Sequence, residues 1–80
     1  YQSENTILYP NPTNNELFIS TEYQTIKSVE IYNALGQAVK HIRSNSSLVM
    51  INCSELINGH YVCFIKTNDS LISKHFSVSH

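Results

Sequence analysis

Apolar and polar residues alternate in short runs along the chain, and turn residues separate these runs about every eight to twelve positions. In one run, Val29 and Ile31 point to one face while Glu30 and Tyr32 point to the other, which is the pattern of a strand buried on one side. The pattern therefore predicts an all-β, seven-stranded antiparallel β-sandwich of immunoglobulin-like type, with strands at residues 7–9, 17–21, 28–32, 37–42, 48–53, 60–67 and 71–78.

Three of these strands have predicted places in the sheets. Residues 7–9 are followed by Pro10-Asn11-Pro12, and because proline lacks a backbone donor this short strand is expected at an edge. Residues 60–67 have apolar side chains on both faces and are expected to be central. The last strand follows a two-residue turn at Asn68-Asp69, which lacks the favoured glycine, and is expected at or beside an edge.

The two glycines mark turns that need special backbone geometry. Asn33-Ala34-Leu35-Gly36 fits a type I turn, and Gly36 is expected to have positive φ at the start of the next strand. Residues 54–57 are too short for a helix and are expected to form one turn that crosses to the other sheet, ending at Asn58-Gly59. Gly59 is likewise expected to have positive φ.

The residues after this turn have the spacing of a tyrosine corner. Leu56, Gly59 and Tyr61 form the pattern L-x-x-G-x-Y, in which a buried tyrosine hydroxyl bonds to backbone a few residues upstream, here near Ile57. An ordinary core tyrosine is the alternative. On the opposite face of the same strand, Val62 and Phe64 need cover from a loop, from the first strand or from a partner.

Composition and charge limit the classes of function. Ile, Val and Thr are frequent and Ala is rare, and 80 residues suffice for one domain, residues 1–80, without a second. The net charge of −1 provides no basic surface for nucleic acid or for an anionic membrane. The longest apolar run, residues 61–65, is far too short for a membrane span, and no signal peptide opens the chain. Direct membrane insertion is therefore not expected.

The sequence contains no arrangement of residues typical of an enzyme. Nucleophile elbows, zinc-protease motifs and phosphate loops are absent, and two glycines cannot build a glycine-rich loop. We therefore expect no catalytic residue, no cofactor and no small-molecule substrate. Cys53, His60 and Cys63 lack a fourth ligand and the usual zinc spacing, so no metal site is predicted. Two alternatives remain for the cysteines, a disulfide or buried free thiols, and the second is favoured.

The order of the motifs resembles that of a known family, the type A C-terminal sorting domain of the type IX secretion system. The resemblance covers about residues 8–78, and its motifs are Tyr9-Pro10-Asn11-Pro12, then Val29-Glu30-Ile31-Tyr32-Asn33 with Leu35-Gly36-Gln37 and Val39, then Leu56, Asn58-Gly59 and Tyr61, and finally Lys74 and Phe76. Four departures are Cys53 and Cys63 at usually aliphatic positions, Asp69 in place of a hairpin glycine, and His80 where a basic residue is frequent.

The resemblance implies a non-catalytic address that directs an exported protein of a Gram-negative bacterium across the outer membrane for surface attachment. The implied partners are the outer-membrane translocon and a sortase-like peptidase, and the implied location is the cell surface or the medium. The parent protein is then expected to end at or near His80. The alternative is an immunoglobulin-like spacer or a carbohydrate-binding module, for which Tyr23 and Tyr32 are the candidate sugar-stacking residues.

The terminal strand is the candidate surface for recognition. Lys74-His75-Phe76 resembles the family's final strand. Lys74, Phe76 and Val78 share one face, so the lysine must either lie at the sheet rim or be turned outward by a bulge. An edge strand has unpaired backbone groups to which a translocon subunit could add a strand. The alternative role for Lys74 is protection of the edge against aggregation. Pro10, Pro12, Gly36, Gly59 and Tyr61 are predicted to be structural residues.

Overall fold

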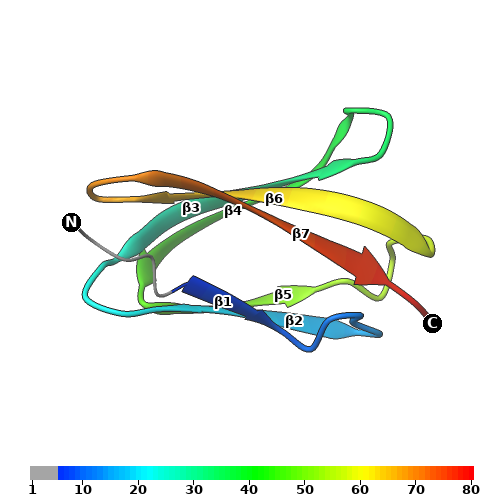
Figure 1. The fold of residues 1–80 in the computed structure, drawn as a ribbon, viewed down its shortest axis with the longest axis horizontal. Helices are drawn as coiled ribbons and strands as arrows, with labels where there is room; N and C mark the ends of the chain where they lie inside the picture. Colours follow the sequence, from blue (N-terminus) through cyan, green and yellow to red (C-terminus); the bar gives the residue numbers. More distant parts are fainter. Residues whose placement is uncertain (1–5) are drawn as a thin grey trace.

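The computed structural model describes residues 6–80, which form a two-layer antiparallel β-sandwich (Figure 1). One layer has the strand order β1-β2-β5 and the other has the order β4-β3-β6-β7. The strands are β1 (Thr6–Tyr9), β2 (Glu16–Thr21), β3 (Ile26–Asn33), β4 (Ala38–Ser46), β5 (Leu48–Asn52), β6 (Gly59–Thr67) and β7 (Leu71–Val78). The predicted seven-stranded sandwich is confirmed. Residues 6–80 contain no helix that could span a bilayer.

Two strands are three residues longer than the sequence pattern predicts, whereas the others differ from it by at most one residue. β3 begins at Ile26, and β4 continues to Ser46 through polar residues that lie between the predicted strands 37–42 and 48–53. Ile26 and Ser46 are cross-strand partners, so the polar end of β4 is held by its pairing with β3. β4 is an edge strand with exposed positions, and polar side chains can occupy it without a burial cost.

The hydrophobic core lies between the two layers and is built by alternate residues of the strands. Because successive side chains point to opposite faces, each inward position packs against the other layer. β6 is interior, between β3 and β7, as predicted from its apolar positions on both faces. The core residues are Leu17, Ile19, Ile26, Val29, Ile31, Val49, Ile51, Cys53, Tyr61, Cys63, Ile65, Ile72, Phe76 and Val78.

The turns follow the predictions from glycine and asparagine. Gly36 has φ 84° and its N–H donates to the Asn33 carbonyl oxygen at 3.0 Å, while the Asn33 side chain accepts from the N–H groups of Leu35 and Gln37. Gly59 has φ 157°, so both positive values are confirmed. Residues 53–58 carry the chain from β5 in one layer to β6 in the other, which confirms the predicted crossover.

The two predicted edge positions are also confirmed. β1 lies at one edge of the three-stranded layer and β7 at one edge of the four-stranded layer. The turn between β6 and β7 has two residues, because the Thr67 N–H donates to the Ser70 carbonyl oxygen at 2.9 Å. Neither Asn68 nor Asp69 has positive φ, so this hairpin is closed without the backbone geometry for which glycine is favoured.

Candidate recognition surface at the terminal strand

Lys74 lies on the core-facing side of β7. The strand pairs with β6 without a register shift, and Lys74 is directly opposite the buried Cys63. Regular alternation gives Lys74 the same orientation as Phe76 and Val78, both of which are buried. Lys74 itself is half-buried, at the edge of the sandwich. Lys74 therefore lies at the rim of the sheet, which was one of the two predicted arrangements. The other, a bulge that turns the lysine outward, is wrong because β7 has no register shift.

Phe76 attaches β7 to β6 through an aromatic stack. Its ring stacks on that of Tyr61 with a centroid separation of 5.6 Å and an interplanar angle of 20°. Tyr61 is 5% exposed, and its hydroxyl donates to the Ile57 carbonyl oxygen at 2.6 Å. The predicted tyrosine corner is therefore confirmed. One side chain satisfies a backbone group of the crossover and also supports the terminal strand.

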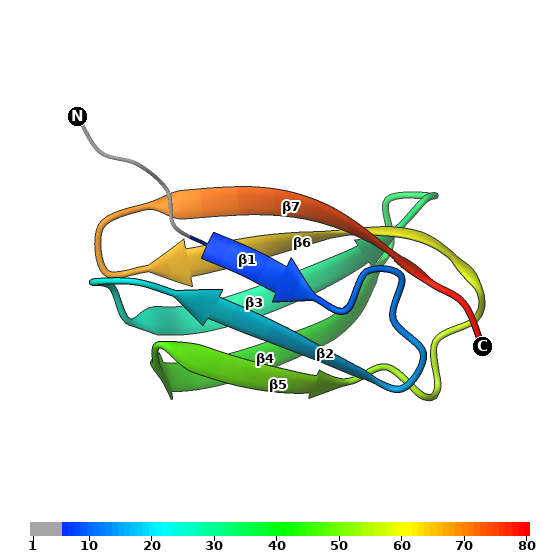
Figure 2. The ribbon, with the colours of Figure 1, turned by 60° about the horizontal axis from the view of Figure 1, so that its bottom comes forward.

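The segment after β1 covers part of the free edge of β7 (Figure 2). The Thr13 N–H donates to the Ser77 carbonyl oxygen, and the Ser79 N–H donates to the Thr13 carbonyl oxygen, both at 2.9 Å. The Ser77 N–H donates to Asn11 Oδ1 at 3.1 Å, and Asn11 Nδ2 donates to the His75 carbonyl oxygen at 3.5 Å. We call residues 10–13 the clasp. It pairs with the last part of β7 as a short parallel strand would.

The clasp changes the expectation that β7 has an unpaired edge along its length. Because the Thr67–Ser70 pair is hydrogen-bonded, the even positions of β7 pair with β6 and the odd positions point to the free edge. The clasp bonds to the edge groups at 75, 77 and 79. The expectation is wrong for that half of the strand. It holds at Leu71 and Ser73, beside which the described chain places no further strand.

The contacts made by the clasp were not predicted. Pro10 and Pro12 were expected only to end the first strand; both follow cis peptide bonds and are exposed. No partner was expected for Asn11 or Thr13. The available signal was an asparagine between two prolines, because neither proline can donate a backbone hydrogen bond and the asparagine amide must then supply the polar contacts.

His80 extends these contacts to the crossover between the layers. Its N–H donates to Asn58 Oδ1 at 2.9 Å, and its ring nitrogens lie 2.9 Å from Asn14 Oδ1 and 2.7 Å from the Leu56 carbonyl oxygen. Since Tyr61 bonds to the next carbonyl, two successive carbonyl groups of the crossover have side-chain partners. His80, a departure from the family pattern, thus bonds to the clasp end of the sandwich and to the crossover.

Both cysteines are buried free thiols, which was the favoured alternative. Burial raises the pKa of the Cys53 thiol, and it raises the pKa of the Cys63 thiol to about 12. Both thiols therefore stay protonated at neutral pH, which makes them poor nucleophiles and poor metal ligands. His60 alternates with the inward Tyr61 and faces away from Cys63. Residues 6–80 contain no group of three potential metal ligands.

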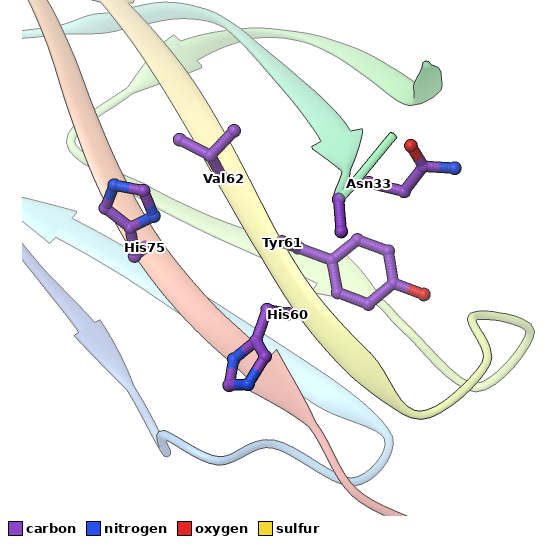
Figure 3. A pocket seen from close by; sticks show the side chains of 6 residues that line it. Asn33, His60, Tyr61, Val62 and His75 are labelled. Carbon is purple, nitrogen blue, oxygen red and sulfur yellow. The ribbon is translucent and has the colours of Figure 1, made fainter. Parts of the chain in front are cut away.

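The outer face of the four-stranded layer carries Val62 and Phe64. Val62 lies between Tyr32 and His75 on the neighbouring strands, and the Phe64 ring meets the Tyr32 ring edge-on at 5.5 Å. The partial cover comes from side chains of the same sheet, so the expectation of a loop or of the first strand as cover is wrong. A shallow pocket lies at the end of this face, with the His60 and His75 rings at its rim (Figure 3).

The two candidate sugar-stacking tyrosines are far apart. Tyr23 is 94% exposed, has φ 63° and lies in the turn before β3, whereas Tyr32 lies near the far end of β3, about 20 Å away at the rise of a strand. The Tyr32 hydroxyl donates to Glu30 Oε1 at 3.2 Å, and the carboxylate charge raises the Tyr32 pKa. They do not form one platform for a sugar.

Comparisons with known proteins agree with the resemblance in the motifs. The profile of the secretion system C-terminal sorting domain matches residues 7–79. The ulvan lyase NLR42 of Nonlabens ulvanivorans is 32% identical over 66 residues, which cover 81% of this chain and 12% of the lyase. The structure of PorZ, a surface component of the type IX secretion system of Porphyromonas gingivalis, matches with a TM-score of 0.76 and 20% identity over 94% of this chain and 11% of PorZ. The chain thus spans about a tenth of either relative.

Proposed function

Because the chain belongs to the family of secretion system C-terminal sorting domains, we propose that the export machinery recognises it through its terminal strand β7. Domains of this family are sorting signals for type IX secretion, and this domain is an export signal and not a catalyst. It directs the protein that carries it to the cell surface or the medium. The proposed direct partners are the outer-membrane translocon and, after export, a sortase-like peptidase.

The free edge at Leu71 and Ser73 is the observation that carries this proposal. β7 is a regular edge strand, and the clasp bonds to edge groups at 75, 77 and 79, so a partner strand has a short place to add at Leu71 and Ser73. Lys74 lies next to this place and half-exposes its side chain at the rim. In the proposal, Phe76 and Val78 anchor the strand in the core, and Lys74 contributes charge to the recognised edge.

A proline substitution tests recognition without removing the strand. Ser73→Pro deletes an N–H that points to the free edge, and edge strands tolerate proline at such positions. Ser73→Thr is the matched control, because it keeps that N–H and has good strand propensity. Each variant of residues 1–80 is fused to a folded reporter that carries a signal for export across the inner membrane. The amount of reporter at the cell surface is then measured in a bacterium with a type IX system.

We expect Ser73→Pro to lower the amount of reporter at the cell surface about tenfold and Ser73→Thr to leave this amount unchanged, with both fusions folded. Lys74→Ala is compared with Lys40→Ala, which removes the equivalent lysine from the opposite edge of the layer. A loss in Lys74→Ala alone would support recognition of its charge. Equal surface levels for parent, Ser73→Pro and Lys74→Ala would refute recognition through β7, and Lys74 would then be an edge guard.

A further inference from the structure

The outer face of the three-stranded layer is an apolar surface that no part of the described chain covers (Figure 2). Cross-strand pairing aligns Tyr9, Phe18 and Met50 in one row across β1, β2 and β5. The neighbouring row places Ile7 and Leu48 on either side of Ser20. Four of the five apolar side chains are 43–58% exposed and Phe18 is half-buried. We call this surface the apolar platform; it consists of Ile7, Tyr9, Phe18, Leu48 and Met50.

The charges of the domain are separated between the two layers. Every one of the five basic residues of the chain lies on the four-stranded layer, namely Lys27, Lys40, Arg43, Lys66 and Lys74. The strands of the platform carry no basic residue, and Glu16 begins β2 at one end of it. Glu22 follows β2 at the other end. The platform is therefore apolar with acidic ends, and a complementary surface is apolar with basic residues at its border.

The geometry argues against three other occupants. Three strands about 4.8 Å apart and about 20 Å long offer about 300 Å², well below the roughly 800 Å² that each partner of a stable dimer buries. A sugar stacks on free ring faces, but Tyr9 and Phe18 stack on each other with centroids 5.5 Å apart at 19°, so each ring has lost one face to its neighbour. An anionic lipid surface needs basic residues beside the apolar ones, and the platform strands have none.

We infer that the apolar platform is a second docking face, which binds an apolar, basic-rimmed protein surface of the export machinery. This inference rests on the proposed function, because the machinery is the partner that a sorting domain must contact. The small area fits a contact that forms and is released during export. The platform faces away from the four-stranded layer, so it can be engaged together with the edge of β7.

Matched double variants test the inference in the reporter fusion of residues 1–80. Leu48→Gln with Met50→Gln makes the platform polar at two exposed positions. Leu35→Gln with Ile57→Gln is the control, because it removes two similarly sized side chains that are 83% and 79% exposed and lie outside the platform strands, in the turn before β4 and in the crossover. A charge test compares Glu16→Lys with Glu55→Lys, since Glu55 is an exposed acid of the crossover. Thermal unfolding of each purified chain checks that it is folded.

We expect the amount of reporter at the cell surface to fall about tenfold in the platform double variant and severalfold in Glu16→Lys. Both controls should match the unsubstituted fusion. Export of the platform variant at parental levels would overturn the inference while leaving the proposed function intact. So would equal losses in the two double variants. The inference would also be overturned if the unsubstituted chain is a dimer in sedimentation and the platform double variant is a monomer, because the occupant would then be a second copy. Binding of the unsubstituted chain to anionic vesicles, lost in the platform double variant, would overturn it in the same way. If the parental fusion reaches the surface equally well without a type IX system, the proposed function and this inference fail together.

Discussion

β4 and β7 form the two edges of the four-stranded layer, and each carries one lysine on its core-facing side. Lys40 is opposite the buried Ile31 on β3, and Lys74 is opposite the buried Cys63 on β6. An inward-pointing charge on an edge strand makes it costly for another chain to extend the sheet. The two edges therefore share one protective device, which supports an edge-guard role for both lysines in addition to any role in recognition.

In other respects the two edges differ. β4 has no fully buried side chain and pairs with β3 through two register shifts, whereas β7 buries Ile72, Phe76 and Val78 and pairs without a shift. An irregular edge is a poor template for another strand, and a regular edge is a good one. The clasp closes half of the regular edge. β4 is thus protected along its length by its irregular pairing, whereas β7 is covered only by the clasp, so the part of β7 at Leu71 and Ser73 is the edge that a partner can use.

The largest expected effect is on the free energy of unfolding, which should depend more on core side chains of β7 than on those of β4. Phe76→Ala should cost about 3–5 kcal/mol of unfolding free energy, because it removes a buried ring and its stack on Tyr61. Ile42→Ala on β4 should cost about 1–2 kcal/mol, since Ile42 is only partly buried. Urea unfolding of both variants measures the difference. Equal losses would show that β4 is as firmly anchored as β7.

The tyrosine corner should come next in size. Tyr61→Phe keeps the ring on Phe76 but leaves the Ile57 carbonyl oxygen without its 2.6 Å partner, at a cost of about 1–3 kcal/mol. The melting temperature of the variant measures this cost. Tyr32→Phe is the control, because its hydroxyl bonds to Glu30 near the surface and its loss should have little effect. An unchanged melting temperature for Tyr61→Phe would mean that the hydroxyl contributes nothing.

Alkaline pH should lower the free energy of unfolding, because it ionises the buried thiol of Cys63 on β6, opposite β7. Its pKa is 9.0 without the folded surroundings and about 12 in the fold, so the native state holds the proton more tightly. The stability that comes from the protonated thiol is therefore fully present below pH 9 and falls as pH rises toward 12, with roughly 1 kcal/mol lost by pH 10. Unfolding of parent and Cys63→Val should diverge in this range. If the free energies of unfolding of parent and Cys63→Val change in parallel with pH, the loss at alkaline pH does not come from Cys63.

Opening the clasp should have a smaller effect on stability. Asn11→Ala removes the acceptor for the Ser77 N–H and should cost about 1 kcal/mol. Amide hydrogen exchange should accelerate at Ser77 and Ser79, with little change at β4. Asn45→Ala on β4, which removes an exposed side-chain contact to Lys27 of β3, is the control. Unchanged exchange at Ser77 would show that the clasp does not protect this edge.

The lysines should have the smallest effect on stability and a measurable effect on solubility. Lys40→Ala and Lys74→Ala should each change unfolding free energy by less than about 0.5 kcal/mol. Light scattering at high concentration should rise more for Lys74→Ala, because the regular edge of β7 is the better template for pairing. Faster aggregation of Lys40→Ala would reverse the comparison between the two edges.

Much of the fold could be predicted because local signals and topology agree. Alternation at residues 28–32, Gly36 and the spacing from Leu56 to Tyr61 each indicate a feature that the structure contains. The extension of β4 to Ser46 could not be predicted, because polar residues enter a strand there only through pairing with β3. The asparagine between two prolines marks a residue that needs polar partners, but its contact with Ser77 could not be predicted, since the two residues are 66 positions apart.

The bridge between Thr13 and Val78 also has a consequence for the timing of folding. It joins a segment next to the first described strand to the last one, so the slow, long-range closure of the sandwich cannot occur during synthesis until β7 has been made. A chain truncated within β6 would lack the partner of the clasp, the ring that stacks on Tyr61 and the edge at Leu71. The address would therefore be complete only after β7 has been translated, and chains that stop before β7 would not be exported.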